Sequence, residues 1–350
     1  GEENADLMIS LMDSPIDFVL CRHEQAAAFM ADTYGRLTGR PGVCLATLGP
    51  GATNLVTGVA DANMDRSPLV AIIGQASTSR LHKESHQNMD AIAMFRPITK
   101  WAHSIGNAKT IPEVIRKAFK VATTEKPGAT VIELPEDLAK AQLSAAPMSV
   151  DVTRRPAADH KAVARAIALI AAAKQPLILA GNGTVRKRAS AQLRRLAQKS
   201  GIGVVNTFMG KGAVSLDDPH CLFTIGLQGR DHITAAFEDA DLVVAVGYDL
   251  VEYGPDFWNA KGDKTIIHID FEPAEIDADF PVAVDVVGDI ADALWQINES
   301  LNKQFGDKLP LFNIADRAAL RGTISDDLLG EAEDRAFPMK PQTVVNDMRS

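Results

Sequence analysis

The feature that most constrains the fold is the alternation of short, continuous apolar runs with longer segments of helical periodicity. In the first part of the chain, turn residues bound four such runs, at 18–21, 43–47, 69–74 and 130–134. Runs of this kind are typical of strands that are buried on both faces of a sheet. Helical patterns separate them, at 24–37, 53–65 and 110–124. The sequence therefore predicts β-α-β units, which build a parallel sheet covered by helices.

The alternation stops and then restarts. Residues 141–159 lose the periodicity and gather Ala, Ser and Pro, which predicts a linker between domains. Beyond it, we expect strands at 176–180, 203–206, 242–246 and 264–270, and helices at 160–173, 187–200 and 289–304. The fold class is therefore α/β, with two doubly wound parallel-sheet domains at 1–140 and 160–305. Residues 306–350 are mixed, and a helix is expected to begin near Lys340.

Composition excludes several classes of partner. The chain has 36 Lys and Arg against 45 Asp and Glu, a net charge of −9, with no long run of either sign. This pattern argues against nucleic acid or an anionic membrane as a partner. No apolar run approaches the roughly 20 residues that cross a bilayer. The three cysteines are far apart, which predicts neither disulfides nor a CxxC metal site and favours a reducing cytoplasm.

The first candidate functional residue is Glu24, in the first turn of a predicted helix directly after a predicted strand. Open α/β sheets bind ligands at the carboxyl ends of their strands. Apolar residues on two sides of the helix, including Met30 and Leu37, predict that it is buried. The alternative is a surface carboxylate that stabilises a helix N-terminus. The spacing of residues alone leaves both interpretations open.

The second candidate is the turn at 47–54, which also joins a predicted strand to a predicted helix. Gly49 and Gly51 permit a close approach of a ligand to the backbone, and Thr53 or Asn54 can cap the helix. The turn lacks the Lys-Ser/Thr ending of a Walker loop. A purely structural turn is the alternative, since glycines are common between strands and helices.

The third candidate is Gly74-Gln75-Ala76, at the end of a predicted strand, followed by the polar stretch 80–90. It contains His82 and His86, whose spacing of four is typical of a metal pair, but no third ligand is evident nearby. We therefore favour a loop that faces a polar substrate.

The fourth candidate is Gly181-Asn182-Gly183, after a predicted strand. It lacks the third glycine of the dinucleotide pattern. A nucleotide-binding module here, with Asp270 and Glu272 as its acidic residues, stays open as an alternative.

Three motifs in order carry a family resemblance. Residues 22–32, 49–54 and 132–137 together resemble thiamine-diphosphate enzymes of the acetolactate synthase and pyruvate oxidase type. The resemblance implies that 1–140 is a pyrimidine-binding domain, 160–305 a central domain, and 306–350 a linker with the first helix of a diphosphate-binding domain. Because the chain starts without Met and ends soon after Lys340, we expect that it is truncated at both ends.

Within that family, the chain is more similar to the catabolic acetolactate synthases than to the biosynthetic, flavin-containing ones. The residues that carry this likeness are 85–90, 95–100 and 246–253. His86 stands where the biosynthetic enzymes commonly have an aromatic residue, and Gly181-Asn182-Gly183 lacks their fuller glycine run. The resemblance therefore disfavours FAD.

The resemblance also implies roles for individual residues. The carboxyl of Glu24 is expected to bond the pyrimidine N1′ of the cofactor, in a dry pocket that raises its pKa. Gln87, together with His86, is expected to reach the reaction centre. The residues expected to bind the cofactor are Glu24, Thr47, Pro50, Gly51 and Asn54.

The implied reaction is acetolactate synthesis: decarboxylation of pyruvate and transfer to a second pyruvate, giving 2-acetolactate and CO2. Thiamine diphosphate and Mg²⁺ are the implied cofactors, and no metal ligand is assigned in this sequence. The implied protein is a cytoplasmic homodimer or homotetramer of branched-chain amino acid or acetoin metabolism, with active sites between subunits. Two alternatives remain: another thiamine-diphosphate-dependent 2-oxo-acid decarboxylase or carboligase, and a fragment that cannot catalyse.

Overall fold

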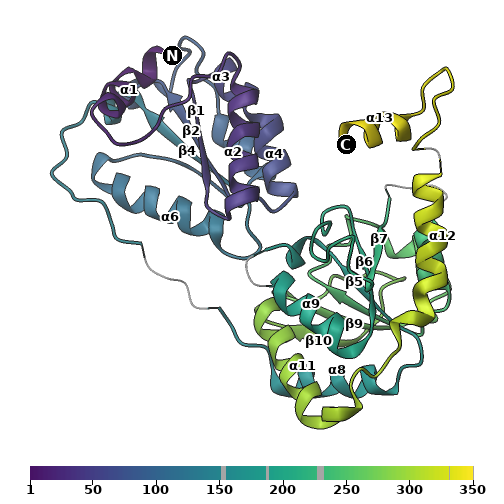
Figure 1. The fold of residues 1–350 in the computed structure, drawn as a ribbon. Coiled ribbons are helices and arrows are strands. Elements are labelled where there is room, and N and C mark those ends of the chain that lie inside the picture. The colour runs from purple at the N-terminus through teal and green to yellow at the C-terminus, as the bar shows by residue number, and fades with distance from the viewer. Residues whose placement is uncertain (151–154, 187–188, 227–231, 331, 350) are drawn as a thin grey trace. The chain divides into compact units, whose positions relative to one another are not determined.

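The computed structural model describes residues 1–150, 155–186, 189–226, 232–330 and 332–349. The chain divides into two compact units, Gly1–Arg154 and Arg155–Ser350, which we call unit 1 and unit 2 (Figure 1). Each contains one parallel sheet, of four strands in unit 1 and six in unit 2, with helices against it. The predicted class of two parallel-sheet α/β domains is confirmed, whereas the boundaries at 140, 160 and 305 stay predictions.

Unit 1 is a three-layer sandwich. Its strands follow the order β1-β2-β4-β3. The helices α2 and α4 pack with Leu69 and Ile73 on one face of the sheet, and α6 packs with Val70 and Ile132 on the other (Figure 1). Neighbouring residues of β2 thus point to opposite covered faces, which is why the strand is a continuous apolar run. The strands are β1 (Gly42–Ala46), β2 (Leu69–Gln75), β3 (Trp101–Ser104) and β4 (Ala129–Pro135). The helices are α1 (Ala5–Met12), α2 (Glu24–Thr38), α3 (Pro50–Asn54), α4 (Val56–Met64), α5 (Ala91–Phe95), α6 (Ile111–Thr123) and α7 (Glu136–Ala139).

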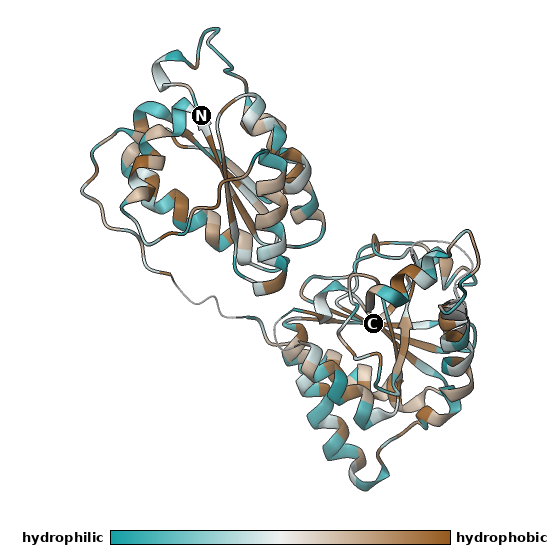
Figure 2. Cartoon of the chain, turned by 45° about the horizontal axis from the view of Figure 1, so that its top comes forward, coloured by the Kyte–Doolittle hydropathy of each residue, from teal (hydrophilic) through white to brown (hydrophobic). Residues whose placement is uncertain are grey.

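Unit 2 has the strand order β10-β9-β8-β5-β6-β7. One core lies under α8, α9 and α11, and a second, rich in aromatic residues, covers the other face of the sheet. The strands of both units are strongly hydrophobic (Figure 2). The strands are β5 (Pro176–Ala180), β6 (Gly203–Asn206), β7 (Cys221–Thr224), β8 (Leu242–Val246), β9 (Thr265–Asp270) and β10 (Val282–Val287). The helices are α8 (His160–Ala172), α9 (Ala189–Ser200), α10 (Ala235–Glu238), α11 (Ile290–Phe305), α12 (Ala318–Leu329) and α13 (Pro341–Arg349).

The strands are added to this sheet first on one side of β5 and then on the other, although all of them are parallel. The chain proceeds from β5 to β6 and β7 on one side, then returns to β8, β9 and β10 on the other. This is the doubly wound arrangement, in which a crevice opens at the carboxyl ends of the two strands where the order reverses. The crevice of unit 2 therefore lies between β5 and β8.

Two predictions about the first 40 residues are wrong. Residues 18–21 form no strand, and Phe18, Val19 and Leu20 are 47%, 63% and 81% exposed. An apolar run becomes a buried strand only beside a partner, and among the described residues no strand pairs with it. Helix α2 is buried on one side only: Met30 and Leu37 are exposed, while small residues such as Ala28 face the sheet.

Three strands and one long helix were not predicted, namely β3, β7, β10 and α12. Strands β3 and β10 carry partly exposed residues, so they lack the continuous apolar run of a central strand. Residues 187–188 of the predicted helix 187–200 lie outside the described residues. In the described part of the chain, no helix combines the length and apolarity that a membrane span needs.

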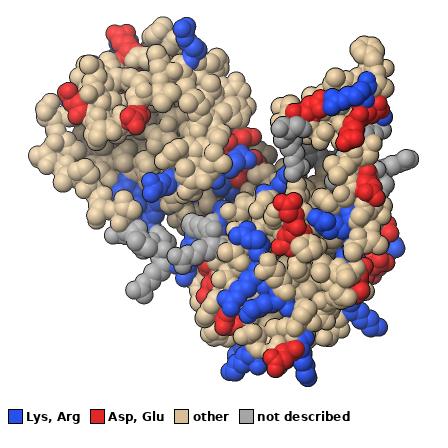
Figure 3. Space-filling view, viewed as in Figure 1, with Lys and Arg blue, Asp and Glu red and all other residues tan. Residues whose placement is uncertain are grey.

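Charges are distributed differently on the two units. On the face of unit 2 that Figure 3 shows, Lys and Arg are interspersed with Asp and Glu. The face of unit 1 in the same view carries few charged side chains.

Candidate active site at the carboxyl edge of unit 1

The first site residue, Glu24, opens helix α2. The ring of the preceding residue, His23, caps this helix, since its Nδ1 accepts a hydrogen bond from the backbone N–H of Gln25 at 3.1 Å. The side chain of Glu24 is half-buried, and its Oε2 accepts a hydrogen bond of 3.0 Å from Nδ2 of Asn54, at the end of α3. Two residues 30 positions apart are thus joined at the carboxyl edge of the sheet.

The glycine turn after β1 closes against this pair. A Cβ at Gly51 would lie 2.6 Å from Cγ2 of Thr47 and 3.5 Å from Oε1 of Glu24. Pro50 occupies the first turn of α3, where its missing N–H is tolerated. The structure therefore brings together all five residues predicted to bind the cofactor: Glu24, Thr47, Pro50, Gly51 and Asn54.

The loop that carries His86 and Gln87 reaches the same turn. Gly49 has φ +57°, and a Cβ there would lie 2.7 Å from Cβ and 2.9 Å from the carbonyl oxygen of Gln87. Gln87 itself has φ +54°. Both His86 and Gln87 are exposed. Since the backbone of Gln87 rests on Gly49, the third predicted segment joins the first two at one edge of the sheet.

Two buried polar residues anchor this loop: Gln75, which belongs to the third candidate, and Glu133, which sequence reasoning did not assign to the site. Gln75, at the end of β2, donates from Nε2 to the carbonyl oxygen of Met89 and to Oε2 of Glu133, both at 3.1 Å. Glu133 lies on β4, is 4% exposed, and burial raises its pKa. A carboxylate inside the apolar run 130–134 is the signal that could have identified the anchor.

The pKa of Glu24 is lower than expected. The hydrogen bond from Asn54 is the main cause and lowers it, and the opposing effect of partial burial is weaker. The expected dry pocket with a raised pKa is therefore wrong for the chain as it stands, because water still reaches the carboxyl and an amide donor stabilises its charge. In this state Glu24 is an ionised hydrogen-bond acceptor at neutral pH.

The alternative of a metal pair gains no support. Among the described residues, no group of three His, Cys, Asp or Glu side chains is arranged to hold a metal ion. His82 and His86 thus have no third protein ligand in that part of the chain.

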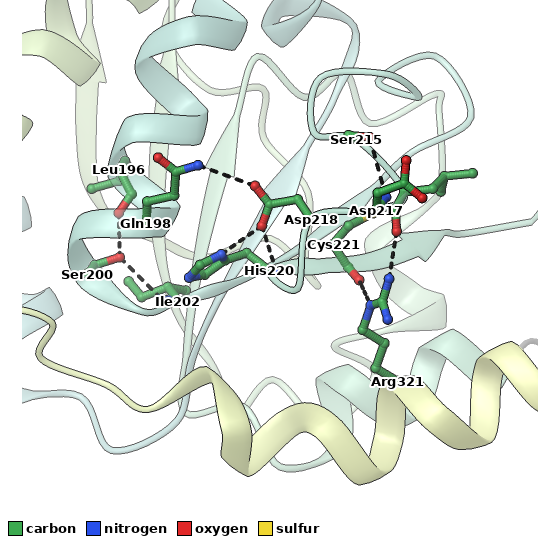
Figure 4. A network of polar contacts seen from close by, with 11 residues as sticks. Leu196, Gln198, Ser200, Ile202, Ser215, Asp217, Asp218, His220, Cys221 and Arg321 are labelled. Carbon is green, nitrogen blue, oxygen red and sulfur yellow. Dashed lines mark hydrogen bonds and ion pairs between the residues drawn. The ribbon is translucent and has the colours of Figure 1, made fainter.

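A second polar cluster lies in unit 2, near the start of β7 (Figure 4). Asp218 lies 2.8 Å from Nδ1 of His220 and accepts a 3.4 Å bond from Gln198. The adjacent thiol of Cys221 is buried, and desolvation raises its pKa, so it is not an activated nucleophile. Arg321 of α12 donates to the carbonyl oxygens of Cys221 and Leu216, at 3.2 and 2.6 Å. This cluster fastens α12 to the sheet rather than forming a catalytic triad.

Two family models match the chain. The model described as the N-terminal TPP binding domain of thiamine pyrophosphate enzymes matches residues 1–94. The model described as the central domain of thiamine pyrophosphate enzymes matches residues 163–297. Together they cover well over half of the chain.

Similar proteins have acetolactate synthase names. The acetolactate synthase of Bacillus subtilis is 37% identical over 303 residues, which are 85% of this chain and 53% of that protein. A probable acetolactate synthase large subunit of Methanococcus aeolicus is 34% identical over 358 residues, 97% of this chain and 59% of that protein. A catabolic acetolactate synthase of Raoultella terrigena is 36% identical over 296 residues, 83% of this chain and 52% of that protein. The chain thus spans about half the length of the curated relatives it matches.

Proposed function

Because the chain carries the N-terminal and central domains of thiamine pyrophosphate enzymes and belongs to that family, we propose that the whole protein is an acetolactate synthase. It decarboxylates one pyruvate and joins the remaining two-carbon unit to a second pyruvate, releasing CO2 and forming 2-acetolactate. The names of its relatives support this substrate. The observation that carries the proposal is the Glu24 carboxylate, held by Asn54 against the glycine turn.

The residues at this edge fit the pyrimidine of thiamine diphosphate. The absence of a Cβ at Gly51 allows the methyl group of Thr47 to pack against the turn beside Glu24, so the turn presents small side chains to a flat ring. When bound, thiamine diphosphate supplies a carbanion at its thiazolium C2. Glu24 would share a proton with the ring nitrogen N1′, and the hydrogen bond from Asn54 orients the carboxylate for that role.

The low pKa of Glu24 in the described chain is compatible with this role. A bound pyrimidine ring would exclude water from the carboxyl, and desolvation of a carboxylate raises its pKa. Glu24 then changes from a permanent anion to a group that takes and returns a proton near neutral pH. His86 and Gln87, on the exposed loop beside Gly49, are the proposed contacts to the substrate.

The remaining parts of the proposal concern the assembly. We propose that Mg²⁺ binds together with the diphosphate of the cofactor, with one or two protein carboxylates and water as its other ligands. The exposed apolar stripe of α2, with Met30 and Leu37, supports a homodimer or homotetramer in which unit 1 is covered. Three free cysteines support a cytoplasmic enzyme, either of branched-chain amino acid or of acetoin metabolism.

The test uses the full-length protein with thiamine diphosphate, Mg²⁺ and pyruvate, and measures CO2 and acetolactate. Glu24→Gln removes the proton exchange, so kcat is expected to fall by about 10²- to 10⁴-fold. Glu113→Gln is the matched control, because Glu113 is also in the first turn of a helix but is exposed on α6.

Failure to release CO2 from pyruvate would refute the proposed substrate. Release from another 2-oxo acid instead would assign the protein to a different decarboxylase or carboligase of the family. Wild-type activity of Glu24→Gln would refute the role of the carboxylate.

A further inference from the structure

The crevice between β5 and β8 of unit 2 is the place where a doubly wound sheet of this order binds a dinucleotide. Such a ligand needs glycines that let its diphosphate approach the backbone, and free N–H groups that point at it. Gly181 and Gly183 follow β5, and Gly247 follows β8. Whether these residues fit a flavin dinucleotide depends on the space between the two loops.

The two loops contact each other directly. The N–H of Gly183 donates to the carbonyl oxygen of Gly247 at 2.8 Å. A Cβ at Gly181 would lie 2.5 Å from that same oxygen, and a Cβ at Gly183 would lie 2.6 Å from Cα of Gly247. The glycines therefore allow one loop to pack on the other, and this contact occupies the space along the backbone that a diphosphate would use.

The carboxyl of Glu252 accepts the hydrogen bonds of the backbone N–H groups at this edge. It accepts hydrogen bonds from the backbone N–H of Asn182 at 3.0 and 3.1 Å and from that of Asp249 at 3.0 Å. The hydroxyl of Thr207 donates to its other side. Glu252 is only 6% exposed. Three loops, which follow β5, β6 and β8, thus converge on one internal carboxyl group.

The acidic residue that a dinucleotide site needs is also not at the expected position in the sheet. In such sheets it follows the second strand of the first half and bonds the ribose. Here that strand is β6, which ends at Asn206 and is followed by Thr207, a partner of Glu252. Asp270 ends β9, which is separated from β5 by β8, and is 1% exposed. The alternative of a nucleotide module built on Gly181 and Asp270 is therefore not supported.

We propose that the carboxyl of Glu252 replaces the ligand diphosphate in the crevice of unit 2, so that this unit holds no flavin dinucleotide. The loops after β5, β6 and β8 form an anion-binding site that the protein's own side chain occupies. Shortening that side chain leaves its hydrogen-bond donors without an acceptor, and a free phosphate can then accept hydrogen bonds from them.

The first test measures flavin in the full-length protein. The purified protein, before and after incubation with FAD, is expected to show no absorbance near 450 nm after removal of free flavin. A stoichiometric flavin that is released on denaturation would overturn the proposal. This readout is independent of the substrate: loss of pyruvate chemistry would refute the proposed function and leave the flavin result unaffected.

The second test compares variants at pH 8, with inorganic phosphate as the probe. Glu252→Ala is expected to have a lower Tm than wild type and to recover several degrees in tens of millimolar phosphate. Wild type and Glu272→Ala, which removes an exposed glutamate of the same unit, are expected to shift much less.

Equal phosphate shifts in Glu252→Ala and wild type would overturn the proposed anion site. Should Glu252→Ala fail to fold, the flavin measurement is unaffected, because it uses the wild-type protein and needs no variant. Flavin binding by the wild type then remains the deciding result.

Discussion

Replacing Glu252 by Gln is predicted to remove a pH dependence from the stability of unit 2. Burial raises the pKa of this carboxyl from 4.5 to about 7, against the bonds from Thr207, Asp249 and Asn182, and the charge of Asp249 raises it further. A raised folded-state pKa means that the folded chain binds the proton more tightly than the unfolded chain. The stability contributed by this group is therefore complete below pH 4.5 and is lost as the pH rises towards 7.

The magnitude follows from the size of the shift. Each pKa unit corresponds to about 1.4 kcal/mol, so the change from 4.5 to about 7 amounts to about 3 kcal/mol of unfolding free energy. Glutamine has no proton to lose. Because part of the change occurs below pH 5, the unfolding free energy of wild type relative to Glu252→Gln is expected to fall by about 2.5 kcal/mol between pH 5 and pH 8.

Urea unfolding at several pH values measures this difference. Tryptophan fluorescence reports unit 2 if Trp101, in unit 1, is replaced by Phe in both proteins, because Trp258 and Trp295 both belong to unit 2. Taking the difference between the two proteins cancels the titration of all other groups. A difference that stays constant within about 0.5 kcal/mol from pH 5 to pH 8 would show that Glu252 does not titrate in this range.

Two further predictions concern unit 1. Asn54→Ala removes the donor that lowers the pKa of Glu24, so that pKa is expected to rise; a ¹³C carboxyl titration that shows no rise would contradict this. Gly42→Ala is expected to destabilise the unit by about 2 kcal/mol or more, because its Cβ would lie 1.9 Å from the carbonyl oxygen of Ala31. Gly39→Ala is the matched control, because its Cβ meets nothing within 4 Å and its φ of +66° costs about 1 kcal/mol. Equal losses of stability in Gly42→Ala and Gly39→Ala would contradict the packing argument.

The sequence predicted the central strands because their apolar signal is local. Strands such as β2 and β8 are covered on both faces, and every residue of a short run is therefore apolar. The edge strand β3 is partly exposed and mixes Trp101 with His103, so no run marks it. A strand was predicted at 18–21 where none forms, because the apolar run itself does not reveal whether a partner strand is present.

The site was predictable to the extent that its residues are neighbours in the chain. The glycine turn follows β1, which places it at the carboxyl edge of the sheet. The carboxylate that opens α2 follows no strand in the structure, and its hydrogen bond with Asn54 places it at the same edge. Gln75 belonged to the third candidate but its anchoring role was not predicted, and Glu252 was not predicted as part of a site. Their roles depend on partners 58 and 70 positions away, Glu133 and Asn182, which only the packed structure brings into contact.

The bond from Gln75 has a consequence for engineering substrate preference. The loop that carries Gln87 is fastened through Met89 to the interior of the sheet, at Glu133. Shortening the side chain at position 133 by one methylene is therefore expected to displace the loop without altering any side chain that is proposed to contact the substrate. The position of the loop thus depends both on its own residues and on Glu133 in the core of β4. A mutant library that varies only the exposed loop leaves the second of these unchanged.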